Sequence, residues 1–139
     1  MSQSRRRWLA LCVAFLLASS PAVACDPPSL GDTQLVADSA RYRIAWRVRP
    51  DPILVAEPFA LEMSVCAKPG VSPAEAVQVD ATMPEHRHGM NYRPSVIDGP
   101  DGRFLAQGML FHMPGKWRLI FDVRAGGITE RLTHDLTVE

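Results

Sequence analysis

The segment that decides the fold is Trp117-Arg118-Leu119-Ile120-Phe121-Asp122-Val123-Arg124-Ala125-Gly126-Gly127. From Trp117 to Val123, a large apolar residue stands at every second position. Successive side chains of a β-strand point to opposite faces, so this spacing predicts a strand with one buried face. Gly126 and Gly127 supply the backbone freedom of a tight hairpin turn. We therefore expect a partner strand directly after them, ending near Val138.

The same period-two pattern recurs upstream. The expected strands are a short edge strand at Leu35–Val36, then Tyr42–Val48, Phe59–Val65, Val77–Ala81 and Phe104–Phe111. Turn residues separate them about every ten residues, which is typical of an all-β chain. The expected fold class is an immunoglobulin-like antiparallel β-sandwich of about seven strands, with a small barrel as the alternative. Arg93–Asp101 is expected to be a loop, and Ser72–Glu75 either a capped helical turn or a plain loop.

Residues 1–24 have the three parts of an export signal. Arg5–Arg7 are basic, Trp8–Ala18 are apolar, and the small-residue end closes with Ala22-Val23-Ala24, an A-x-A cleavage pattern. The apolar run is shorter than the roughly 20 residues of a membrane-spanning helix. We therefore expect a cleaved signal peptide, one mature domain at 25–139 without a transmembrane span, and a periplasmic or otherwise exported location. A general secretory signal is favoured over a twin-arginine signal.

Cysteine usage fits an oxidising compartment. Cys12 leaves with the signal, so the mature chain keeps Cys25 and Cys66, and two such cysteines usually form one disulfide bond. The alternative is lipoprotein anchoring at Cys25, because Ala22-Val23-Ala24-Cys25 resembles a lipoprotein cleavage box. That box usually has a leucine where this chain has Ala22, so we favour the disulfide.

The charge distribution excludes a nucleic-acid binder. Removal of residues 1–24 takes away three arginines and no acid, so the mature net charge is 12 − 15 = −3. No basic patch with interleaved aromatic residues is present. The sequence also has no G-x-S-x-G nucleophile motif and no glycine-rich phosphate loop, so we do not expect an enzyme.

Two short clusters concentrate histidine and methionine. The first is Met83-Pro84-Glu85-His86-Arg87-His88-Gly89-Met90, and the second is His112-Met113-Pro114-Gly115. If the first cluster is extended, His86, His88 and Met90 point to one side, because they lie two residues apart. Met83 then becomes a core residue at the strand end. Met63 and Met109 are also expected in the core, and His134 is expected to bind no metal.

We predict that the two clusters meet and form a metal site with the ligands His86, His88, Met90, His112 and Met113. Thioethers are soft ligands that select Cu(I), and imidazole suits Cu(I), Cu(II) and Zn(II). Zinc sites rarely use methionine, and calcium needs more oxygen ligands than this segment has. The expected cofactor is therefore copper, as Cu(I) or Cu(II). The clusters can meet only if both lie at the same end of the sandwich.

The two clusters also resemble those of the YtkA-like domain, a family of small exported or membrane-anchored bacterial proteins akin to FixH-type oxidase-assembly proteins. The resemblance rests on Ala81–Met90, on Gly108-Met109 and on Phe111–Trp117. It implies an immunoglobulin-like sandwich and a role in copper handling, as a chaperone or as an oxidase-assembly factor. The implied partner is a membrane copper oxidase or a copper-trafficking protein. The alternative is a metal-free protein-interaction module of the cell envelope, with Arg87, Tyr92 and Trp117 on its contact surface.

Overall fold

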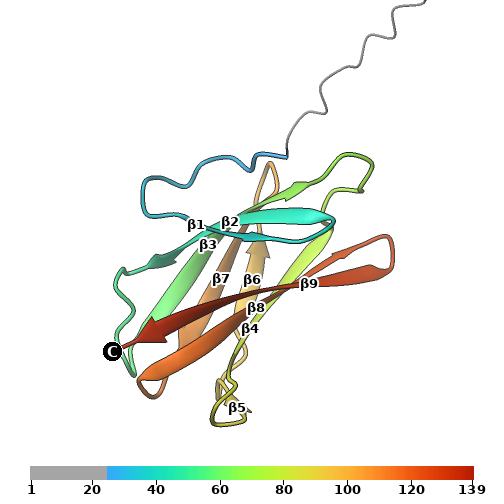
Figure 1. Cartoon of the computed structure of the whole chain (residues 1–139). Helices are drawn as coiled ribbons and strands as arrows, with labels where there is room; N and C mark the ends of the chain where they lie inside the picture. Colours follow the sequence, from blue (N-terminus) through green and yellow to red (C-terminus); the bar gives the residue numbers. More distant parts are fainter. Residues whose placement is uncertain (1–24) are drawn as a thin grey trace, which may run out of the picture.

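The computed structural model describes residues 25–139, and this part of the chain is all-β (Figure 1). Its nine strands are β1 Leu35–Asp38, β2 Tyr42–Arg49, β3 Pro58–Ala67, β4 Ala76–Met83, β5 His88–Gly89, β6 Ser95–Asp98, β7 Arg103–Leu110, β8 Gly115–Ala125 and β9 Ile128–Val138. The strands form two antiparallel sheets in the orders β1-β2-β3-β7-β6 and β5-β4-β8-β9. The predicted antiparallel sandwich is confirmed. The expected signal peptide at residues 1–24 lies outside the described residues.

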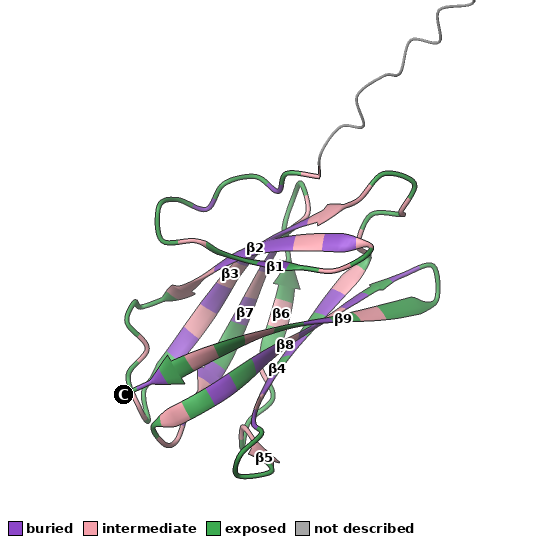
Figure 2. Ribbon diagram, viewed as in Figure 1, coloured by how far each residue is buried: buried purple, intermediate pink, exposed green. Residues whose placement is uncertain are grey.

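The period-two pattern produces one buried face on each long strand. In Figure 2 buried residues alternate with more exposed ones along β3, β4 and β8. On β8, Trp117, Leu119, Phe121 and Val123 have no exposed surface, while Arg118 is exposed. The outer arginines are paired across strands, as Arg118 is with Asp135 on β9. The segment that predicted the fold therefore lies at the centre of the four-stranded sheet.

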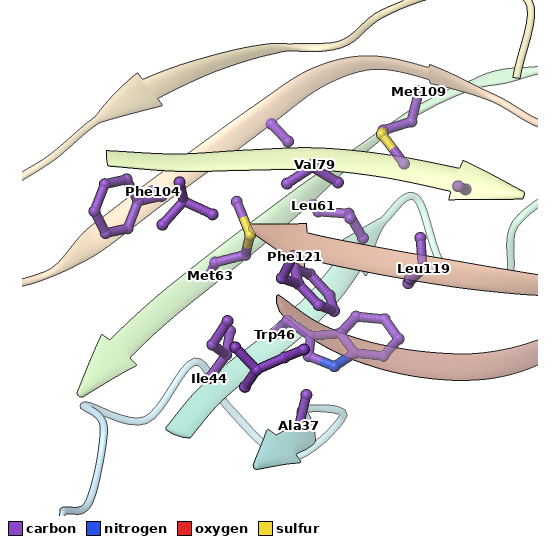
Figure 3. Close-up of a cluster of buried hydrophobic side chains, with 14 of the residues drawn as sticks. Ala37, Ile44, Trp46, Leu61, Met63, Val79, Phe104, Met109, Leu119 and Phe121 are labelled. Carbon is purple, nitrogen blue, oxygen red and sulfur yellow. The ribbon is translucent and has the colours of Figure 1, made fainter. Parts of the chain in front are cut away.

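The core lies between the two sheets (Figure 3). Trp46 from β2 meets Phe121 from β8 with ring centroids 5.9 Å apart, which joins the sheets at their middle. Met63 and Met109 are buried there, as predicted. His134 is half-buried on β9, and its ring meets that of Trp46 edge-on at 5.0 Å. The described part of the chain contains no helix able to cross a membrane.

The structure corrects two expectations about the connections. The loop expected at Arg93–Asp101 contains β6, which pairs with β7 from Ser95 to Asp98. Only one of the four β6 side chains, Val96, is partly buried, so the sequence shows no alternation there. The second correction is the two-residue strand β5, which raises the number of strands to nine. Ser72–Glu75 forms a plain loop, one of the two alternatives expected.

The predicted disulfide between Cys25 and Cys66 is present, with a sequence separation of 41 residues. It ties the start of the described chain to the penultimate residue of β3. The Asp38 carboxylate at the end of β1 forms an ion pair with Lys68 and accepts a hydrogen bond from the Arg43 guanidinium. These hydrogen bonds hold the pKa of the Asp38 carboxyl at about 2. The bridge and the Asp38 pairs fasten the same end of the five-stranded sheet.

The opposite end of the sandwich collects several chain reversals. Strand β4 ends at Met83, β7 ends at Leu110, and β8 begins at Gly115. The link between β7 and β8 crosses from one sheet to the other. Its first residue is anchored, because the Phe111 carbonyl accepts a hydrogen bond from the backbone N–H of Ala56 at 2.7 Å. Both histidine and methionine clusters therefore lie at this end.

Candidate metal site

The first cluster forms a tight turn. The Met83 carbonyl accepts hydrogen bonds from the backbone N–H groups of His86 at 3.1 Å and Arg87 at 2.9 Å. Arg87 adopts a positive φ of 56°, which closes the turn. The expectation that His86, His88 and Met90 all lie on one extended strand is therefore wrong at His86. That residue is exposed on the turn, and only His88 and Gly89 form a strand.

His88 is positioned by strand pairing. It lies directly opposite Met83 in the antiparallel pair of β5 and β4. Directly opposed residues project on the same face, and Met83 is buried in the core. His88 therefore turns its ring toward the interior at the end of the sandwich. Its Nδ1 lies 3.3 Å from the Gly89 carbonyl oxygen. If Nδ1 donates to that oxygen, Nε2 is left as the free ligand atom.

The two clusters meet through their histidines. The ring centroids of His88 and His112 are 5.0 Å apart, and those of His86 and His88 are 5.8 Å apart. A metal–imidazole bond is about 2.0–2.1 Å long, so two rings that share an ion have centroids within about 6 Å. The predicted meeting of the clusters thus occurs at distances that suit a shared ion.

Trp117 forms the floor beneath these histidines. Its ring centroid lies 6.0 Å from that of His88 and 5.5 Å from that of His112, and both histidines meet it edge-on. Phe111 stacks on Trp117 at 4.3 Å with an interplanar angle of 11°. The Trp117 indole N–H donates to the Met113 carbonyl at 3.0 Å, which fixes the turn that carries Met113. An aromatic floor keeps water from one side of the histidine pair.

His112 carries an unsatisfied nitrogen. Its Nδ1 is buried and has no hydrogen-bond partner among the described residues. A buried polar atom without a partner costs about 1–3 kcal/mol, so such atoms usually mark a bound water, an ion or a functional site. Nδ1 of His112 therefore fits a metal ligand, because coordination would satisfy it.

The methionines fall into two groups. Met83 is buried at the strand end, as expected, and a Cβ at Gly115 would approach its Cε to 2.8 Å. The flexible end of Met83 can shift to relieve that contact, so it is the φ of 126° that favours glycine at position 115. Met90 and Met113 are half-buried and pack against the core. Their backbones are held beside the histidines, since Met90 N–H donates to Ala81 and Met113 accepts from Trp117.

The arrangement provides two converging imidazoles rather than a closed cage. Within residues 25–139, no three histidine, cysteine or acidic side chains converge to hold a metal ion. His86 thus does not complete a three-histidine group with His88 and His112. Any further ligands would have to be the thioethers of Met90 and Met113. A set of two nitrogens and two sulfurs suits Cu(I) better than zinc or calcium.

One neighbour of the site was missed from the sequence. The sequence pattern places Trp117 only on a strand and on a contact surface, whereas in the structure it has no exposed surface and contacts both histidines. Its position in the sequence could have indicated this role. Trp117 is the first residue of the most regular apolar alternation, and it follows the predicted turn at Gly115 by two residues. Tyr92, by contrast, is 61% exposed and Arg87 is exposed, as a contact surface requires.

Comparison with known proteins leaves the family open. No family model matches the chain, and no curated protein matches it. Two solved structures of FetP from uropathogenic Escherichia coli strain F11 are similar. A copper-bound single-residue variant of FetP has 6% identity over 77% of this chain and 90% of that chain, with a TM-score of 0.49. FetP as isolated from the periplasm of E. coli BL21(DE3) has 9% identity over 77% and 97%, with a TM-score of 0.48. Similarities of this extent imply neither a shared ligand nor a shared function.

Proposed function

We propose that this chain is an exported copper-binding protein of the YtkA-like type, which holds Cu(I) between His88 and His112. The observation that carries the proposal is the 5.0 Å separation of these two rings, together with the unbonded, buried Nδ1 of His112. The thioethers of Met90 and Met113 supply the soft ligands that favour Cu(I) over Cu(II). His86, exposed beside His88, suits the capture and release of the ion.

The disulfide supports the proposed compartment. Disulfides persist in the periplasm and outside the cell, and are rare in the cytosol. Cys25 and Cys66 are joined, and a sulfur in a disulfide cannot also carry a lipid thioether. We therefore propose a periplasmic or otherwise exported protein whose Cys25 is bridged rather than lipidated.

Carriage and delivery fit this site better than catalysis. The proposed ion would lie at the end of the sandwich, next to the exposed turn that carries His86 and Arg87. Tyr92 lies a few residues further on and is largely exposed. A membrane copper oxidase or a copper-trafficking protein could contact this surface and receive the ion. If the domain is instead a metal-free interaction module, partner binding through Tyr92 should survive removal of copper by a chelator.

The double variant His88→Ala/His112→Ala tests the site. We expect the mature protein to bind one equivalent of Cu(I), and the double variant to bind it about 100-fold or more weakly, because both nitrogen ligands are lost. Loss of a group that merely supports a metal ligand already costs about 10–100-fold in affinity. Competition with a chromophoric Cu(I) chelator measures the change.

His134→Ala is the matched control, because His134 also lies half-buried against a tryptophan but belongs to neither cluster. Its Cu(I) affinity should equal that of the wild type. Thermal unfolding of all three proteins without copper separates loss of ligands from loss of fold. Equal Cu(I) affinity in the double variant and the wild type would rule out the proposed site.

A further inference from the structure

Strand β4 has an open edge along most of its length. From Ala76 to Thr82 it pairs with β8 on one side in an unbroken register. On the other side, β5 covers only Thr82 and Met83. The stretch from Ala76 to Ala81 therefore has no strand partner on that side within the described sheets.

The hydrogen bond at Ala81 shows which backbone groups of β4 point toward this open edge. Its carbonyl accepts a hydrogen bond from Met90, so the backbone of Ala81 faces the side of β5. Backbone direction alternates along a strand, so Val77 and Val79 face the same side. The Ala81 N–H is already bonded to the Asp80 carboxylate at 2.8 Å. For Val77 and Val79, no hydrogen bond on this side joins them to any other described residue.

A groove runs along this open edge. It has a volume of 540 Å³ and extends from the outward face of the four-stranded sheet, over the edge of β4, to β6 of the other sheet. Val77 and Val79 line one wall, and Val96 of β6 lines the other. Figure 1 shows β6 and β4 on neighbouring edges of the two sheets. The groove thus combines unpaired backbone groups with partly apolar walls, which is what an added strand requires.

From this geometry we infer that the β4 edge is a docking site for an extended segment of a partner protein, which adds to the four-stranded sheet beside Val77 and Val79. The added strand would exchange backbone hydrogen bonds with both valines and place alternate apolar side chains between β4 and β6. Because β5 occupies the same side of β4, the added strand would end against the hairpin that carries His86 and His88. This docking does not depend on bound copper.

The charged residues that line the groove favour a partner segment with basic side chains. Arg131 donates two hydrogen bonds of 2.7 Å to Asp122, so the opposite charges of these two residues offset each other within the groove. The other charged residues that line the groove are Asp80, Asp98 and Arg93, so acids outnumber bases. A second copy of β4 would bring further acids to the same edge, since Glu75 and Asp80 flank the open stretch. A partner strand with lysine on its outward face complements Asp80, which alternates with the buried Val79 and Ala81 and so lies on the outward face of β4.

The test uses the full mature protein and a capped seven-residue peptide that alternates valine with lysine. Hydrogen exchange measured by NMR reports each amide. We expect the peptide to slow exchange of the Val77 and Val79 amides and to leave the outer edge of β9 unchanged. Asp80→Asn should raise the peptide Kd about two- to fivefold, the usual worth of an exposed ion pair. Asp51→Asn, at an exposed acid outside the groove, should leave it unchanged.

Two control peptides sharpen the result. Glutamate in place of lysine should weaken binding, and N-methylation of alternate backbone amides should abolish it. No protection of Val77 and Val79 at millimolar peptide would overturn the proposal, and so would equal binding of the N-methylated peptide. Protection that rises with protein concentration alone would also overturn it, because the occupant would then be a second copy of the chain.

Discussion

Replacement of Trp117 by alanine is expected to lower the free energy of unfolding by about 3–5 kcal/mol. Trp117 has no exposed surface, stacks on Phe111 at 4.3 Å and donates its indole N–H to Met113. Its removal opens a cavity beneath the crossing between the sheets and leaves the Met113 carbonyl without its donor. A loss of this size is a large share of the roughly 5–15 kcal/mol that stabilises an ordinary domain. Guanidinium unfolding followed by far-UV circular dichroism measures it.

Two further variants test whether the loss of stability comes from the packing of Trp117 or from the removal of any aromatic residue. Trp117→Phe keeps most of the stacking on Phe111 but loses the N–H donor, so it should cost clearly less than Trp117→Ala. Tyr92→Ala removes an aromatic residue that is 61% exposed, and should change the free energy of unfolding by no more than about 0.5 kcal/mol. A cost below about 1 kcal/mol for Trp117→Ala, on the order of a surface change, would show that Trp117 does not hold this end of the sandwich together.

The second large effect is expected at the disulfide. Cys66→Ser should lower the free energy of unfolding by about 4 kcal/mol, because the bond closes a loop of 41 residues and so restricts the unfolded chain. For a domain of this size, the melting temperature should fall by about 10–20 °C. Calorimetry under non-reducing conditions measures the change.

The wild type provides its own control for this prediction. A reducing agent should lower its melting temperature to that of Cys66→Ser, and should leave the variant unchanged. Cys25→Ser should match Cys66→Ser, since either change removes the same bond. Equal stability of the wild type and the two variants would contradict the expected role of the bridge.

The fold could be predicted wherever a strand buries one face completely. The alternation from Trp117 to Val123 and from Phe59 to Val65 shows burial directly, because the core excludes polar residues at those positions. Strand β6 gave no such signal, since only Val96 of its four residues turns partly inward. It forms through backbone pairing with β7, and its two β-branched residues, Val96 and Ile97, are too short a run to distinguish a strand from a loop.

That missed strand also decided whether the clusters could meet. After the β5 hairpin, β6 leads away from the site end and β7 leads back, so His112 arrives beside His88. A sequence pattern that shows β7 but not β6 does not indicate at which end of the sandwich His112 lies. The orientation of His86 was likewise not predictable, because it depends on the positive φ of Arg87, a residue type with no preference for that conformation. Residue types could suggest the ligands, but backbone geometry had to bring them together.

X-ray absorption at the copper edge tests the central claim most directly. The sample is the mature protein with one equivalent of Cu(I) and the Cys25–Cys66 bridge intact. The expected first shell has two imidazole nitrogens at about 2.0 Å and at least one thioether sulfur at about 2.3 Å. The imidazole signal should disappear in His88→Ala/His112→Ala. A shell without sulfur, or imidazole scattering that persists in the double variant, would contradict a copper site built from His88, His112 and the methionines beside them.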